Sequence, residues 1–184
     1  MQEYIDRKDE INLDGISVNH GESVFLSMSI GYEYLVPGRY STYLNVSNVK
    51  DDDLSKKLKC MIKEMHYEGI FDGEFMVGQD DEIYFLEVNF RPNAFNYAST
   101  CAGMNDPFLW AKGMLDGYVD NSHYKTIPSG FHAMVEPTDF KDRVIGKRSS
   151  FFRWLIDFFK CQCHYYFNIR DIKPFINFLI KKAV

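Results

Sequence analysis

Hydrophobic and polar residues alternate along much of the chain, and a period of two is the pattern of a β-strand with one buried face. The segments with this pattern are residues 10–18, 23–35, 42–49, 70–77, 82–90 and 130–136. Residues 1–5 also read as the end of a strand. The alternation therefore predicts a sheet with one face packed against a core.

Helical spacing of the apolar residues replaces this alternation in four segments, namely residues 51–69, 105–117, 148–162 and 172–184. The first is the clearest, because aspartates begin it and an apolar stripe follows at intervals of three and four residues. Strands, a helix, strands and further helices thus follow one another. This order indicates an α+β fold with a mainly antiparallel sheet and packed helices, followed by a helical C-terminal appendage.

The strand at residues 84–90 carries an unusual second face. Its apolar face is predicted to hold Tyr84, Leu86, Val88 and Phe90, and its other face to hold Phe85, Glu87, Asn89 and Arg91. A carboxylate, an amide and a guanidinium therefore follow one another on the face that core packing does not require.

A hairpin turn centred between Asp80 and Asp81 places Glu74 directly opposite Glu87, and Met76 opposite Phe85. Two facing carboxylates repel each other unless a neutral or positive group lies between them. With Asn89 they form an oxygen-rich set that suits Mg²⁺ or Mn²⁺.

Two alternatives remain open at this point. The polar face could be solvated, with Arg91 neutralising Glu87. A three-residue turn would instead place Glu74 opposite Leu86 or Val88 and separate the two carboxylates.

Composition sets broad limits on the class of protein. The chain has 184 residues, of which 46% are hydrophobic and 26% charged, which suits one medium domain or one domain with an appendage. No apolar run approaches the roughly 20 residues that cross a bilayer, and no secretory signal pattern is present. The four cysteines are too sparse for a disulfide framework, and CQCH at residues 161–164 lacks a second ligand cluster. A cytoplasmic location is the default expectation.

Charge is distributed unevenly. From Arg143 to the C-terminus there are nine Lys/Arg and two Asp/Glu, although the whole chain has a net charge of -5. This basic, aromatic region could dock at a membrane surface or meet an acidic polymer. We favour a pair of helices that pack onto the sheet, because aromatic stripes on helices are usually core. Nucleic-acid binding is not expected, given the acidic remainder.

The segment GIFDGEFMVGQDDEIYFLEVNFRP, residues 69–92, resembles the metal-binding part of the ATP-grasp ligases. It is most similar to the carbamoyl-phosphate synthetase large chain and the carboxylate–amine ligases of the D-aspartate ligase type. The family pattern is an acidic or amide residue, a short turn, and a strand that ends Glu-x-Asn-Pro-Arg. Glu74, Glu87, Asn89 and Arg91 occupy these positions. The resemblance implies that the first three bind the magnesium (or manganese) ions on the ATP phosphates, and that Arg91 contacts the transferring phosphate and the acyl phosphate.

The start of the chain looks like the hinge strand of the same family. By that resemblance Glu3, Tyr4 and Ile5 flank the adenine of ATP, and Glu10 binds the ribose hydroxyls; a generic edge strand is the alternative. Residues 101–117 are similar to the segment that follows the motif in the family. Phe90 replaces the usual proline, and residues 92–97 replace a Gly/Ser-rich continuation, which leaves the acceptor substrate open.

The resemblance implies that residues 1–117 are the C-terminal lobe of an ATP-grasp domain and that residues 118–184 form a basic extension. The complete enzyme would activate a carboxylate as an acyl phosphate, which an amine then attacks. The family's earlier segments, with two phosphate-contacting lysines and a glycine-rich loop, do not occur in this sequence. We therefore expect an incomplete or truncated ligase that needs an N-terminal half or self-associates. A non-catalytic interaction module with the same fold is the alternative, so enzymatic activity of this chain stays open.

Overall fold

The computed structural model describes residues 4–37, 40–50 and 52–182 of the chain. These residues form seven strands, mainly antiparallel, and six α-helices, which confirms the predicted α+β fold. The chain divides into two compact units, Met1–Gly31 with Val46–Ser129 and Tyr32–Asn45 with Gly130–Val184. Within the described ranges, no helix combines the length and the apolarity that crossing a membrane requires.

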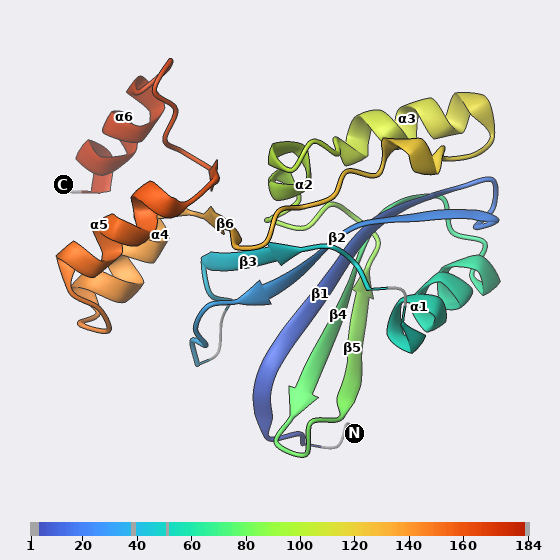
Figure 1. Cartoon of the computed structure of the whole chain (residues 1–184), viewed down its shortest axis with the longest axis horizontal. Helices are drawn as coiled ribbons and strands as arrows, with labels where there is room; N and C mark the ends of the chain where they lie inside the picture. Colours follow the sequence, from blue (N-terminus) through green and yellow to red (C-terminus); the bar gives the residue numbers. More distant parts are fainter. Residues whose placement is uncertain (1–3, 38–39, 51, 183–184) are drawn as a thin grey trace. The chain divides into compact units, whose positions relative to one another are not determined.

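The first unit is built on four antiparallel strands in the order β5-β4-β1-β2 (Figure 1). Their bounds are β1 Arg7–Val18, β2 Ser23–Tyr32, β4 Gly69–Gly78 and β5 Ile83–Asn89. The β1–β2 turn requires Gly21, because this residue has φ +83 and a Cβ atom there would lie 2.8 Å from the Cα of Lys63. The predicted strand at residues 1–5 is wrong for its described part, since residues 4–6 lie outside any strand.

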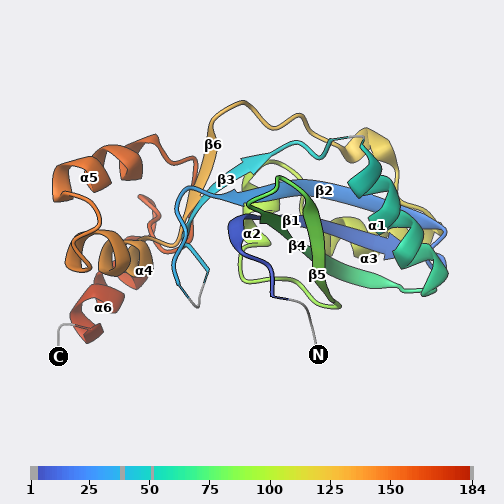
Figure 2. The ribbon, with the colours of Figure 1, turned by 90° about the horizontal axis from the view of Figure 1, so that it is seen from below.

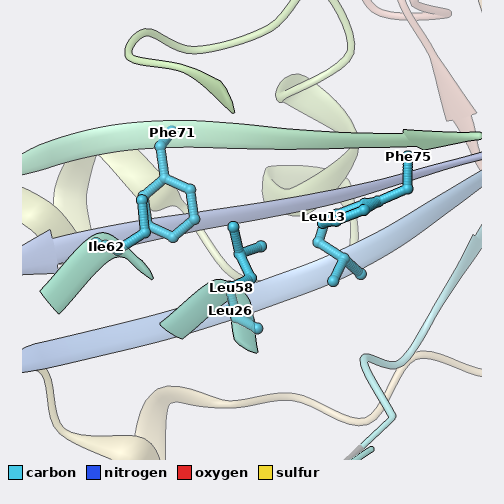
Figure 3. Packing of buried hydrophobic residues seen from close by; sticks show 6 residues of the cluster. All are labelled: Leu13, Leu26, Leu58, Ile62, Phe71 and Phe75. Carbon is cyan, nitrogen blue, oxygen red and sulfur yellow. The ribbon is translucent and has the colours of Figure 1, made fainter. Parts of the chain in front are cut away.

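Helix α1 (Asp53–Glu64) covers one face of these strands. The Asp52 side chain accepts a hydrogen bond from the Ser55 backbone N at 3.0 Å and so caps the helix. Apolar residues from α1, β1, β2 and β4 then form a single buried cluster (Figure 3). Its members are Leu13, Leu26, Leu58, Ile62, Phe71 and Phe75. Gly73 allows this close approach, because a Cβ atom there would lie 2.9 Å from Leu58 Cδ2.

The opposite face of β1 and β4 is covered by α2 (Tyr97–Cys101) and α3 (Asp106–Asp116), and the 3₁₀ helix η1 (Asn121–His123) follows (Figures 1 and 2). Asn105 caps α3 by accepting from the Phe108 backbone N at 2.9 Å, and Gly117 ends it with φ 78. The even-numbered residues of the central strands point to this side, away from the α1 core.

The second unit contains its own aromatic core. Its elements are β3 (Tyr43–Ser47, of which the first three residues belong here), β6 (Phe131–Met134), α4 (Glu136–Phe140), the π-helix η2 (Lys141–Ile145), α5 (Phe151–Lys160), β7 (Cys163–His164) and α6 (Lys173–Lys182). Trp154 and Phe158 of α5 pack with Tyr43 and Met134, which confirms α5 as a core-forming helix. The short α4 and η2 were not predicted from the sequence. Phe152 and Phe159 on α5 stay exposed.

Candidate metal and nucleotide site

The β4–β5 hairpin places Glu74 directly opposite Glu87, as predicted. The turn that produces this pairing differs from the predicted turn. The turn has three residues, 79–81, closed by a hydrogen bond from Gly78 N to Glu82 O at 2.9 Å, which moves the pairing by one residue. A β-bulge between Glu74 and Phe75 then restores the register. The three-residue turn and the bulge compensate each other, and the two carboxylates meet.

The bulge changes which side chains share a face near the turn. Phe85 lies opposite Phe75 rather than Met76, so the predicted Met76–Phe85 pair is wrong. The rings of Phe75 and Phe85 are 6.0 Å apart on the α1 side, whereas Tyr84 pairs with Met76 on the polar side and donates to Asp80 at 2.7 Å. The expected assignment of Tyr84 to the apolar face and Phe85 to the polar face is thus reversed by the bulge.

The amide of Asn89 joins the two carboxylates. Its Nδ2 donates to Glu74 Oε1 at 2.8 Å and to Glu87 Oε1 at 3.3 Å. Arg91 in turn donates to Asn89 Oδ1 at 3.2 Å and to the Pro92 carbonyl at 3.3 Å. Among the described residues Arg91 forms no ion pair with Glu87, so the alternative in which it neutralises that carboxylate is not observed.

Two further rows extend this polar face across three strands. Asn12 lies opposite Glu74, and Asp14 lies opposite Asp72, which itself faces Asn89. Asn12 Nδ2 donates to Asp72 Oδ1 at 3.2 Å. The sequence prediction missed these residues, although their spacing of two from Glu10 and Glu74 is a signal that places them on the same face.

Asp14 on this face and Asp106 of α3 are both buried. Burial first, and then the charges of Asp72 and Asp106, raise the pKa of Asp14 well above its usual value. Burial likewise raises the pKa of Asp106 to about 6. Asn96 Nδ2 donates to both groups, at 3.3 Å to Asp14 Oδ2 and at 2.9 Å to Asp106 Oδ2. Ser27 Oγ also donates to Asp106, at 2.9 Å.

The loop that departs from the family pattern supplies these amides. Besides Asn96, Asn93 Nδ2 donates to Asp14 Oδ1 at 2.7 Å, and Asn93 Oδ1 accepts from the Phe95 backbone N at 2.7 Å. A Gly/Ser-rich segment has no amide side chains to satisfy two buried carboxyl groups. Asn93 and Asn96 therefore supply amide donors to the buried carboxyl groups of Asp14 and Asp106.

The polar face has the donor chemistry for a hard divalent cation. Glu74 and Glu87 converge on one amide group, and rotation of that amide would present Asn89 Oδ1 as a third oxygen. In the described part of the chain, no group of three or more His, Cys, Asp and Glu side chains stands ready to hold a metal. The set that fits is thus two carboxylates and one amide, with room in the shell for water or phosphate oxygens.

Four residues were expected to contact ATP beyond its phosphates, namely Glu3, Tyr4 and Ile5 at the adenine and Glu10 at the ribose. Glu3 lies outside the described residues. Tyr4 is 87% exposed and, like Ile5, precedes β1 without belonging to a strand. Glu10 lies opposite Met76 on β4, on the same face as Asn12, and its carboxylate accepts from Arg7. The structure thus brings Glu10 to the polar face with Glu74, Glu87 and Asn89.

No protein-family profile matches the chain. Over 96 residues, 50% of this chain, it is 32% identical to the biotin-dependent acyl-coenzyme A carboxylase alpha3 subunit of Mycobacterium leprae. The fold is similar to a biotin carboxylase-beta-gamma-ATP complex from Campylobacter jejuni, with a TM-score of 0.52, 19% identity and 71% of this chain covered. It is also similar to N5-carboxyaminoimidazole synthetase from Staphylococcus aureus, with a TM-score of 0.52, 18% identity and 76% covered.

These similarities define the class of fold: the chain carries part of the ATP-grasp fold, as the hairpin sequence predicted. The chain spans 16% of the curated relative, and 30% and 38% of the two solved structures. The polar face formed by β1, β4 and β5 is the candidate site within this part of the fold.

Proposed function

We propose that Glu74, Glu87 and Asn89 bind the Mg²⁺ or Mn²⁺ ions that hold the phosphates of ATP. The chain would then be the ATP- and magnesium-binding lobe of a carboxylate–amine ligase that acts through an acyl phosphate. The observation that carries this proposal is the direct opposition of Glu74 and Glu87, bridged by the Asn89 amide. The ATP-grasp fold around them supports it.

The chemistry demands charge neutralisation. A triphosphate and a substrate carboxylate repel each other, and negative charge moves between them as the phosphoryl group transfers. A bound divalent cation supplies the positive charge that offsets this repulsion. Glu74 is 9% exposed and fixed between two neighbouring strands, whereas Glu87 is exposed on β5. Glu74 is thus the more rigidly held of the two proposed ligands, and Glu87 is open to solvent.

Arg91 is the candidate catalytic residue, with the transferring phosphate as its ligand. Its guanidinium now donates to Asn89 Oδ1. If that oxygen turns to a metal ion, the guanidinium loses this acceptor and gains a nearby anion in the metal-bound phosphate. Metal binding and the orientation of Arg91 are then coupled through one amide side chain.

Tyr4, Ile5 and Glu10, with Glu3, are the proposed contacts to the adenosine part of ATP. The proposed division of roles assigns residues 1–117 to this lobe and residues 118–184 to a basic extension. The partners are a carboxylate and an amine substrate, with an N-terminal ATP-grasp half or a second copy of the chain completing the enzyme. We expect weak nucleotide binding and no turnover from this chain alone.

The proposal is tested by titrating the chain with a non-hydrolysable ATP analogue, with and without Mg²⁺, by saturation-transfer NMR. We expect binding that Mg²⁺ strengthens, and that Glu87→Gln makes independent of Mg²⁺. The matched control is Glu64→Gln, an exposed carboxylate at the end of α1. Undiminished Mg²⁺-dependent binding by Glu87→Gln contradicts the site. Absence of any nucleotide binding, together with self-association in sedimentation experiments, favours the interaction module.

A further inference from the structure

A polar pocket is formed entirely by residues of the second unit. It has a volume of about 590 Å³, which is within the usual size range of small-molecule sites. Its lining comes from residues 33–35, β3, β6, η2, the segment between η2 and α5, and one face of α5. Nothing in the proposed ATP site uses these residues.

The floor of the pocket is a buried and neutralised arginine. Arg143 is 8% exposed and is carried by the π-helix η2, an irregularity that often marks functional positions. Its guanidinium donates to Asp139 at 3.4 Å and to Asp157, and it lies 5.1 Å from the ring centroid of Tyr43. The charge of Asp157, one of the two acidic residues in the lining, is thereby offset.

The other acidic residue in the lining is also paired. His132 Nε2 lies 3.0 Å from Glu33 Oε1, and His132 Nδ1 lies 2.8 Å from the Gly130 carbonyl. Both ring nitrogens of His132 thus face hydrogen-bond acceptors, a carboxylate and a carbonyl. The His132 ring also stacks on Tyr43, with centroids 5.2 Å apart.

Three cationic side chains at the pocket remain without such partners. Arg148, Arg153 and Lys160 line it and are exposed, and within the described ranges no hydrogen bond or ion pair engages their side chains. Arg153, Asp157 and Lys160 follow each other at intervals of four and three residues, so one face of α5 turns all of them toward the pocket. Ser149, beside Arg148, also lines the pocket, and its hydroxyl donates to the Ser150 carbonyl at 3.4 Å.

We propose that this pocket binds a small oxyanion with two or more negative charges, held by Arg148, Arg153 and Lys160 above the Arg143 floor. Phosphate and carboxylate groups both present pairs of oxygen atoms that the guanidinium group of arginine binds with two hydrogen bonds. Exposed cationic side chains at the rim also attract such anions at low salt. This inference goes beyond the proposed ATP-binding function, because every residue involved belongs to the second unit. It also gives the basic C-terminal region a role that the ligase interpretation leaves unexplained.

The test is calorimetric titration of the full chain with pyrophosphate and with tricarballylate, in EDTA and at low salt. At least one anion is expected to bind, and the stronger of the two identifies the ligand as phosphate-like or carboxylate-like. Arg148→Gln/Arg153→Gln should weaken binding by about tenfold or more, since charge-assisted hydrogen bonds are lost. The control Arg170→Gln/Lys173→Gln removes equal charge from exposed positions of the same unit and should change affinity by less than about twofold.

All substituted side chains are exposed, so thermal unfolding should match wild type and confirm that the variants fold. Absence of binding by both anions overturns the proposal. Equal weakening in the two double variants also overturns it, because general charge attraction would then explain the binding.

Discussion

Glu74 and Glu87 lie directly opposite each other on β4 and β5, and both accept hydrogen bonds from one amide group. Two carboxylates in this arrangement repel each other and destabilise the hairpin unless a hydrogen-bond donor or a cation lies between them. Asn89 Nδ2 fills that role here, at 2.8 and 3.3 Å. The same arrangement therefore stabilises the hairpin when the amide donates, and provides metal ligands when the amide turns.

Removing the bridging amide should destabilise the fold. Asn89→Ala leaves Glu74 and Glu87 facing each other without this donor, and we expect the free energy of unfolding to fall by about 1–2 kcal/mol. Denaturant unfolding in EDTA measures this change. Asn121→Ala, at an exposed position on η1, is the control. An equal effect of both substitutions would contradict the bridging role.

Asn96 should contribute more than an exposed amide, because it donates to both Asp14 and Asp106. Asn96→Ala removes a donor from two buried carboxyl groups, and we expect a loss of about 1–3 kcal/mol in the free energy of unfolding. Combining it with Asp106→Asn should give a smaller loss than the sum of the two single changes, since the partners interact directly. Strict additivity would show that the Asn96–Asp106 hydrogen bond is energetically unimportant.

The raised pKa of Asp106 predicts a specific pH dependence of stability. Burial raises the pKa to about 6 in the folded chain from an ordinary value of 3.8, so the folded state binds this proton more tightly than the unfolded state. The contribution of Asp106 to the free energy of unfolding should therefore fall as the pH rises from about 4 to about 6, and then stay constant. Asp106→Asn should flatten this part of the profile in denaturant titrations. A profile unchanged by the substitution would contradict the assignment.

The main elements and the central pair follow from local patterns. Alternation gave β1 to β6 but not the two-residue β7, and helical spacing gave α1, α3, α5 and α6. The assumed hairpin register placed Glu74 opposite Glu87, although the turn that produces this pair is a different one. The bulge after Glu74 has no sequence signal of its own, because it arises from fitting a three-residue turn to a pairing that the rest of the sheet fixes. This is why Phe85 and Tyr84 were assigned to the wrong faces.

The amide network around Asp14 and Asp106 depends on contacts between distant segments. Asn93 and Asn96 reach across about 80 positions of sequence to meet Asp14, and no local pattern reports such a distance. The positions of Asp72 and Asn12 on the polar face could have been predicted, because strand alternation on β4 and β1 places them beside Glu74. The short α4 and the π-helix that carries Arg143 were missed because elements this short lack a full period of apolar residues.

The central claim is that Glu74 and Glu87 bind one divalent ion together, and Mn²⁺ titration followed by electron paramagnetic resonance tests it most directly. Glu74→Gln and Glu87→Gln should each weaken Mn²⁺ binding by about tenfold or more, and the double variant should lose little beyond either single one. Glu64→Gln should bind as wild type does. Wild-type affinity in both single variants, or no Mn²⁺ binding by the unaltered chain, would contradict the account.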